Sequence, residues 1–368
     1  MFKPASEWRK TFGREISATI TPLPGEGLRA LFRRLSDLLN GASILNMFVF
    51  GPAGMSEAGA KAMRLVLGEI CWPVTWVEGG ACDVNSIAGI QVFAVHAGEV
   101  QGIRLNGRCL GSVFEDGDVR HCLLGGLFSA EPLRSRGDQT KQCLEEMDAA
   151  LAQAGFSIAD TVRTWFFLED ILAWYGEFNR ARTQTYSGIR FRSQSLPAST
   201  GVGGRNPAGA ALTLAAWAMQ PRHPSARAKE VASPLQCPAP AYGSSFSRAV
   251  EYGSTAGRRL LISGTASIAP EGASLWKEEI AHQVEETMRV VEGIVRSQGG
   301  ALSDLTRATA YFKRRADAKV FLEWCAAHGL LSLPVVLANC DICRDELLFE
   351  LEAEADLRYP MPLKPHAL

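Results

Sequence analysis

The stretch Leu-Pro-Val-Val-Leu-Ala-Asn-Cys-Asp-Ile-Cys-Arg-Asp-Glu-Leu-Leu-Phe-Glu-Leu-Glu-Ala-Glu, residues 333–354, carries the strongest structural signal in the chain. At its end, apolar side chains alternate with Glu350, Glu352 and Glu354. Alternate residues of a strand share a face, so this segment predicts a strand with one apolar and one acidic face. The simplest interpretation is a half-buried strand whose glutamates face water. The alternative is an acid catalyst on a rigid strand, because Cys343 and Arg344 lie just upstream.

Working outward, the last third of the chain reads as one β-α-β unit that this strand closes. An apolar strand at 258–267 contains Gly264 and is followed by a turn. Apolar residues then recur at helical spacing from Ile280 to Val295, and Gly299-Gly300 ends the helix. A strand at 306–312 and a second helix at about 316–328 complete the unit before the acidic strand.

The same order of elements recurs in the middle third. Four residues lie 144 positions before four counterparts: Gln139, Gly155, Asp160 and Arg163 precede Gln283, Gly299, Asp304 and Arg307. The middle closing strand, 210–219, carries no carboxylate, and the first third is a degenerate copy. We therefore predict an α+β fold of three modules, 1–116, 117–232 and 233–368, in an internal pseudo-trimer. Ligand sites favour clefts between such units.

Composition excludes several classes of function. The chain has 368 residues, 47% of them apolar, and a net charge of −1, so no strong field attracts nucleic acid or an anionic membrane. No segment approaches the ~18–20 uninterrupted apolar residues of a membrane span. Nine cysteines and no apolar signal core near Met1 favour a reduced, cytoplasmic protein. The pair Cys340 and Cys343 has no second pair at ligand spacing, so we expect neither a metal nor another cofactor.

The last third resembles the RidA family, also called YjgF or endoribonuclease L-PSP, through its Ile-Ser-Gly strand, its Leu-Pro turn and its Glu-x-Glu closing strand. RidA proteins are homotrimers with clefts between subunits, so the resemblance implies that this chain is a fused version. The more specific resemblance is to the chorismatases, enzymes that hydrolyse chorismate. The segments that carry it are 242–249, 262–270 and 343–352, within a similar region of about 233–358.

The resemblance to chorismatases implies roles for individual residues. Glu350 matches the catalytic acid, and Arg248 matches an arginine that binds a substrate carboxylate. Cys343 and Gly264 match the pair found in chorismatases that release pyruvate and 3-hydroxybenzoate, with Gly264 leaving room for the substrate ring. Cys343 would serve as a nucleophile or a proton donor, and otherwise as a buried apolar side chain.

The sequence does not decide which other residues bind the substrate. The second carboxylate-binding arginine is Arg182, Arg205 or Arg344, and we expect Tyr242 and Tyr186 to contact the substrate as well. We expect a small anionic substrate, no nucleic-acid or membrane partner, and a monomeric pseudo-trimer or a homodimer.

Two alternatives remain at this point. A RidA-type imine deaminase would hold its substrate with an arginine after the Leu-Pro turn, where this chain has Val335-Val336 and Ala198-Ser199. A catalytically silent RidA-like protein that binds a small carboxylate is the other.

Overall fold

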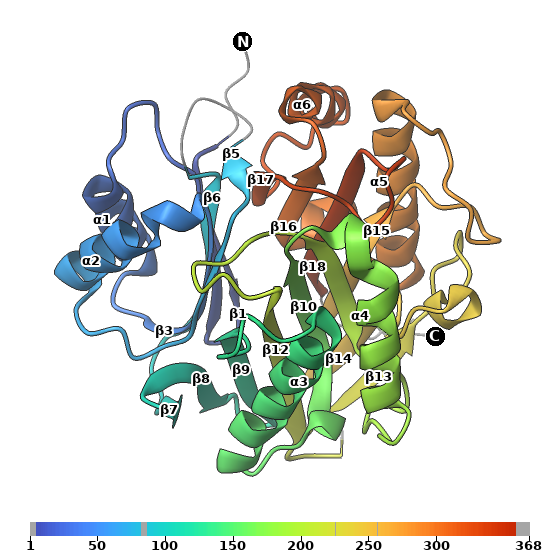
Figure 1. Ribbon diagram of the computed structural model, residues 1–368. Coiled ribbons are helices and arrows are strands. Elements are labelled where there is room, and N and C mark those ends of the chain that lie inside the picture. The colour runs from blue at the N-terminus through green and yellow to red at the C-terminus, as the bar shows by residue number, and fades with distance from the viewer. Residues whose placement is uncertain (1–4, 82–86, 225, 256, 358–368) are drawn as a thin grey trace, which may run out of the picture.

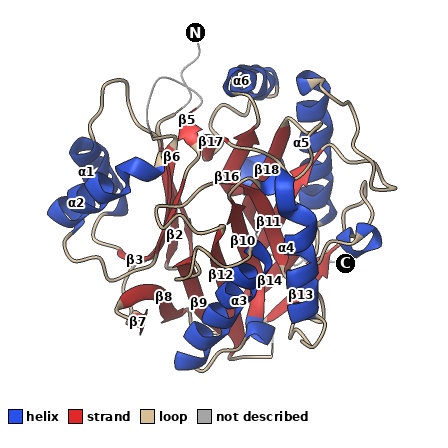
Figure 2. Cartoon of the chain, viewed as in Figure 1, coloured by secondary structure: helices blue, strands red, loops and turns tan. Residues whose placement is uncertain are grey.

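The computed structural model describes residues 5–81, 87–224, 226–255 and 257–357. These residues form three mixed β-sheets that stand around a common centre, each built almost entirely from one consecutive third of the chain (Figure 1). The α-helices lie on the outside and the strands fill the middle (Figure 2). Among the described helices, none combines the length and the apolar character that crossing a membrane requires.

The first sheet has the strand order β1-β2-β6-β3-β4, and two helices cover its outer face. Its elements are β1 (Glu7–Phe12), β2 (Glu15–Ile20), α1 (Leu28–Leu39), β3 (Ser43–Phe50), α2 (Ser56–Leu67), β4 (Val74–Val77) and β6 (Gly89–Val95). One short strand of this third, β5 (Gly80–Ala81), pairs instead with the third sheet.

The second sheet has the order β11-β10-β12-β9-β8-β7. Its elements are β7 (Gln101–Leu105), β8 (Arg108–Glu115), β9 (Val119–Leu127), α3 (Arg136–Gln153), β10 (Thr161–Leu168), α4 (Ile171–Tyr186), β11 (Ala198–Gly203) and β12 (Leu212–Pro221). The module boundary expected at residues 116 and 117 falls between β8 and β9, which pair within this sheet.

The third sheet has the order β13-β14-β15-β18-β16-β17-β5. Its elements are β13 (Arg227–Val231), β14 (Ala249–Ser254), β15 (Gly257–Ala266), α5 (Ile280–Ser297), β16 (Leu305–Phe312), α6 (Ala318–Ala327), β17 (Val335–Asn339) and β18 (Phe349–Leu357). The helical spacing seen in the sequence is that of the buried face of α5, where Val284, Met288 and Val291 pack in one core with β15 and β18.

Strand registers relate the three modules. The strands β3, β10 and β16 each pair in parallel on one side and antiparallel on the other, and each has a β-bulge near its start. Four residues beyond the bulge, Phe50, Phe167 and Tyr311 occupy equivalent positions. The Phe50 ring centre lies 6.2 Å from that of Phe167 and 6.4 Å from that of Tyr311, so the three meet at the centre of the molecule. The expected α+β fold of three modules in a pseudo-trimer is confirmed.

The acidic face of β18 is buried, so the interpretation of a wet, half-buried strand is wrong. The side chains of Glu350, Glu352 and Glu354 are all shielded from solvent. Alternation correctly predicted which residues share a face, but the second module covers that face: Arg163 of β10 reaches Glu352 across the module boundary.

A second buried ion-pair cluster joins the first and third modules. The Arg259 guanidinium lies 2.6 Å from a carboxylate oxygen of Glu15 on β2 and 2.6 Å from one of Asp356 on β18. Arg259 and Glu15 are buried and Asp356 largely so. Removing one partner of such a cluster leaves uncompensated charge away from water, which is strongly destabilising.

We predict that Arg259→Met lowers the free energy of unfolding by about 3–5 kcal/mol, because Glu15 and Asp356 lose their shared cation. Urea unfolding followed by circular dichroism measures this. The control is Arg296→Ala, which breaks an exposed pair with Glu292 on α5 and should change the free energy by about 0.5 kcal/mol or less. Equal effects of the two substitutions would contradict the assignment.

Candidate active site

A cavity of about 720 Å³ opens between the second and third modules. Helix α4 and strand β11 of the second module line one side, and β15, β18 and the segment 242–248 of the third module line the other. The two walls are joined by hydrogen bonds: the Ser199 N–H donates to the Ser263 hydroxyl at 2.8 Å, and the hydroxyls of Thr183 and Ser245 lie 2.6 Å apart. Six of the eight residues predicted for the site line this cavity: Glu350, Cys343, Arg248, Gly264, Tyr242 and Arg344.

Glu350 presents its carboxyl group to the cavity from β18 and is only 4% exposed. Burial disfavours its charged form, and the nearby Glu352 carboxylate adds to this effect. Together they raise the pKa of Glu350 to about 8, against the opposing influence of Arg163 and Arg248. Within the described residues no group hydrogen-bonds the Glu350 carboxyl. A protonated carboxyl that is free to donate is what a general acid at neutral pH requires.

Gly264 makes room for this carboxyl group. A methyl group on Gly264 would lie 2.0 Å from Glu350 Oε1, far inside any allowed contact. The space beside Gly264 that was expected to hold a substrate ring is thus filled by the Glu350 side chain. The Gly264 N–H donates to the Thr200 hydroxyl at 3.1 Å, which fixes the strand at this point.

Two buried arginines, Arg248 and Arg182, face the cavity. Each is 2% exposed, and within the described residues neither forms an ion pair. Arg248 donates to the Cys237 carbonyl at 3.0 Å, while its Nη2 has no hydrogen-bond partner among the described residues. Arg182 bonds only neutral groups of the described chain, the Asn179 amide oxygen at 2.7 Å and the Ser199 hydroxyl at 3.3 Å.

The guanidinium carbons of Arg182 and Arg248 lie 5.9 and 5.6 Å from the centre of the same ring, that of Phe246. The two cations therefore flank one aromatic side chain on the cavity wall. Burying a cation is unfavourable unless an anion pairs with it. This arrangement favours a ligand that carries two negative charges.

Cys343 and Tyr175 meet on the cavity wall. Burial raises the pKa of the Cys343 thiol to about 12, and the Glu350 carboxyl adds to this, with Arg344 opposing. Burial likewise raises the pKa of the Tyr175 phenol, with Cys343 contributing. Both groups are neutral proton donors near pH 7. The nucleophilic role considered for Cys343 is disfavoured, because it requires a thiolate.

Two predicted residues lie outside the cavity, and we do not include them in the site. Arg205 is exposed and pairs with Glu78 at 3.0 Å in a smaller depression where the three modules meet. Tyr186 packs in the core of the second module, with its ring centre 5.3 Å from that of Phe191.

Among the three candidates for the second arginine, the geometry favours Arg182. Arg344 lines the cavity, but its guanidinium bonds the Gly272 carbonyl at 2.8 Å and the Ser274 hydroxyl at 3.1 Å. Tyr175 had no signal in the sequence beyond its helical position. Its place in the site depends on how α4 packs across the module boundary.

The interface between the first and second modules repeats part of this construction without the acid. At the boundary between the first and second modules, the Gly126 N–H donates to the Thr75 hydroxyl at 3.0 Å, as Gly264 does to Thr200. The strand registers place Thr213 of β12 and Gly89 of β6 at the position of Glu350. Neither can donate a carboxyl proton, so the acid occurs once among the three modules.

One cluster of metal-ligand type occurs in the described part of the chain, away from this cavity. The ligand atoms of Glu15, Asp116 and His121 lie within 4.8 Å of one another. The Trp217 indole N–H donates to His121 Nδ1 at 3.1 Å. Since an indole N–H can only donate, Nδ1 is the acceptor and the ring proton is on Nε2. The atom that faces Asp116 is therefore an N–H, which does not ligate a metal ion.

Comparison with known proteins identifies the class to which this fold corresponds. A chorismatase crystal structure superposes with a TM-score of 0.66, covering 92% of this chain and 98% of the other at 18% identity. In sequence, a 3-hydroxybenzoate synthase of Streptomyces hygroscopicus is 27% identical over 243 residues, 58% of this chain and 68% of the relative. A chorismatase of the same organism is 25% identical over 209 residues, 52% and 60% of the two chains. No protein-family model matches. The resemblance to chorismatases is thus confirmed in fold and in sequence.

We predict that Gly264→Ala displaces the Glu350 carboxyl, because the new methyl group would occupy the position of Oε1. A crystal structure of the variant would show Glu350 in a different rotamer. The matched control is Gly201→Ala in the same cavity, where the nearest atom to a new methyl group is 3.7 Å away on Tyr175, an ordinary contact. Glu350 unmoved in the Gly264 variant, or moved in both, would contradict this account.

Proposed function

We propose that this protein is a chorismatase, which cleaves the enol ether of chorismate and releases pyruvate together with 3-hydroxybenzoate. The observation that carries the proposal is a buried Glu350, whose pKa burial raises to about 8, in one cavity with two buried arginines that pair with no carboxylate of the described residues. The likeness to a 3-hydroxybenzoate synthase and a chorismatase supports the same substrate.

Substrate binding follows from charge. Chorismate is a dianion, and Arg182 and Arg248 are two buried cations that lack anionic partners within the described residues. Each carboxylate would accept charge-assisted hydrogen bonds from one guanidinium, contributing about 1.5–3 kcal/mol each. Substrate binding would then replace the unfavourable burial of two lone cations with two ion pairs. The ring of Tyr242, whose centre lies 5.4 Å from the Arg248 guanidinium carbon, holds that arginine in place.

Ether cleavage begins with proton transfer. Glu350 donates its proton to the methylene carbon of the enolpyruvyl group, and positive charge develops on the carbon that bears the ether oxygen. Water adds to that carbon and returns a proton to the Glu350 carboxylate. The resulting hemiketal breaks its bond to the oxygen attached to the ring, and the hemiketal hydroxyl proton passes to that oxygen, which gives pyruvate and a cyclohexadiene diol. Protonation of carbon is slow, so a fixed acid with a raised pKa accelerates the step.

Aromatisation of the diol requires loss of one water molecule. The leaving hydroxyl must gain a proton and a ring C–H must lose one, so hydrolysis and dehydration together consume no net water. The Cys343 thiol, kept protonated by burial, can donate its proton to the leaving hydroxyl, and the resulting thiolate can take the proton from the ring C–H, which restores the thiol. The Tyr175 phenol lines the cavity beside Cys343.

We predict that Glu350→Gln, which keeps the shape but removes the acid, lowers kcat for pyruvate release from chorismate by about 10²-fold or more. In the parent protein, activity should be level below about pH 7 and fall as pH rises through about 8, because the acid form exists below the pKa. A coupled pyruvate assay measures both. Turnover of chorismate by Glu350→Gln at the parent rate would refute the acid role, and binding without any turnover by the parent would favour a silent binding protein.

We also predict that Cys343→Ala diverts product from 3-hydroxybenzoate toward the non-aromatic diol while pyruvate release continues. The reason is that alanine fills the thiol position but has no proton to give. Chromatography of the product mixture decides the matter, with Cys325→Ala as a control, because Cys325 is buried in the core of the third module. An unchanged product ratio in Cys343→Ala would show that the thiol is structural.

A further inference from the structure

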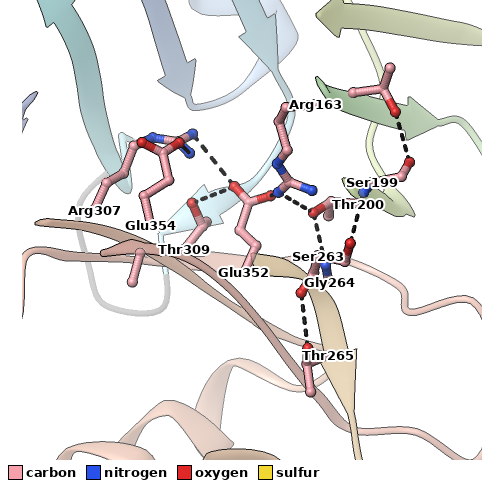
Figure 3. A network of polar contacts seen from close by, with 12 residues as sticks. Arg163, Ser199, Thr200, Ser263, Gly264, Thr265, Arg307, Thr309, Glu352 and Glu354 are labelled. Carbon is pink, nitrogen blue, oxygen red and sulfur yellow. Dashed lines mark hydrogen bonds and ion pairs between the residues drawn. The ribbon is translucent and has the colours of Figure 1, made fainter. Parts of the chain in front are cut away.

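The three glutamates on the buried face of β18 differ in their partners. The carboxylate of Glu352 accepts from Arg163 Nη2 at 2.7 Å and from the Thr309 hydroxyl at 3.0 Å, and Arg307 lies 3.5 Å away (Figure 3). Glu354 pairs with Arg307 at 3.0 Å. Glu350 faces the cavity instead. Donors converge on Glu352 as they do on an ionised carboxylate.

The spacing on β18 places the Glu352 charge next to Glu350. Residues two apart on a strand lie about 7 Å from each other on the same face. Both side chains are buried, so water screens their interaction poorly. A fixed negative charge at this distance opposes the appearance of a second one on Glu350.

The other groups that face Glu350 do not supply this effect. Arg163 on β10 and Arg248 ahead of β14 are cations, which favour the ionised form of Glu350. Cys343 and the Tyr175 phenol of α4 are neutral near pH 7, since burial raises the pKa of each. Of the described groups that face Glu350, Glu352 is the negative one, so the acid form of Glu350 depends on burial and on Glu352.

From this arrangement we propose that Glu352 is a positioning residue of the site: its ion-paired carboxylate holds Glu350 in the protonated form needed for catalysis. The proposal rests on the proposed function of Glu350 as the acid. Glu352 itself touches no substrate, because it lies behind the cavity wall.

Arg163 contacts both the Glu352 carboxylate and a residue that positions Gly264. The same Nη2 that binds Glu352 also donates to the Thr200 hydroxyl at 2.7 Å, and that hydroxyl accepts the Gly264 N–H (Figure 3). The Glu350 carboxyl in turn lies directly against Gly264. One arginine from the second module therefore fixes both the charge beside the acid and the space that the acid occupies.

The test compares Glu352→Gln with Glu354→Gln. Both remove one buried carboxylate from the same strand face, but Glu354 is farther from Glu350, and its carboxylate bonds only Arg307 among the described side chains. Infrared spectroscopy follows the protonated carboxyl band against pH, with Glu350→Gln identifying the band of Glu350. In the parent the midpoint should lie near pH 8. Glu352→Gln should lower it by about one pH unit or more, and Glu354→Gln should leave it unchanged.

Equal midpoints in the parent and in Glu352→Gln would overturn the proposal, as would an equal shift in Glu354→Gln. If Glu352→Gln does not fold, the double variant Arg163→Met, Glu352→Met replaces the buried ion pair with apolar groups, which proteins tolerate better. The Glu352 carboxylate influences the pKa of Glu350 more strongly than the opposing Arg163 cation does. The infrared midpoint of Glu350 should therefore still fall in the double variant, but by less than in Glu352→Gln. A midpoint that stays or rises would overturn the proposal.

Pyruvate release separates this inference from the proposed function. In Glu352→Gln the alkaline limb of the pH–rate profile should move to lower pH by the same amount as the infrared midpoint. A parent protein that leaves chorismate intact would reject the proposed function, while the infrared titration would still decide the role of Glu352. A shifted midpoint with an unshifted rate profile would reject Glu352 as a positioning residue for catalysis.

Discussion

The ion pair between Arg163 of the second module and Glu352 of the third is the contact on which the site depends. It is 2.7 Å long and both partners are almost wholly buried. Further hydrogen bonds support this buried pair at each end: Thr200 bonds Arg163 and Thr309 bonds Glu352, while Arg163 Nε and Nη1 have no hydrogen-bond partner among the described residues. The pair thus fixes the relative position of two strands from different modules. The carboxyl group of Glu350 lies on the same face of β18 as Glu352, against Gly264 of β15.

Pseudo-threefold symmetry explains both the stability of this arrangement and its occurrence at one interface. The three central strands meet through Phe50, Phe167 and Tyr311, and each module boundary buries one face of a closing strand. Symmetry supplies the scaffold three times, but the acid position holds Glu350, Thr213 and Gly89 in turn. A fused chain can vary each copy independently, so one interface can carry the acid and the others can serve packing.

Much of the fold was predictable because it is local and repeated. The constant offset of 144 residues between Arg163 and Arg307 marks equivalent β-bulges, and helical spacing located α5. Burial of the acidic face was not predictable from alternation. Alternation determines which side chains share a face. The residues that cover that face can lie far away in the sequence: Arg163, which covers Glu352, is 189 positions from it.

The candidate site was predictable to a similar degree. The motif residues Glu350, Cys343 and Arg248 lie together because they follow one module's own strands and turns. Arg182 and Tyr175 come from α4 of the preceding module, so the sequence offered three arginines without a means of choosing among them. The role of Gly264 was also hidden, because the atom that needs its space belongs to a strand 86 residues later.

The most direct test of the central claim is a crystal structure of Glu350→Gln soaked with chorismate. The account predicts intact chorismate in the cavity, with one carboxylate on Arg182, the other on Arg248, and the enolpyruvyl methylene carbon beside the side-chain amide that replaces the Glu350 carboxyl. Chorismate bound elsewhere, or bound with either arginine still unpaired, would contradict it.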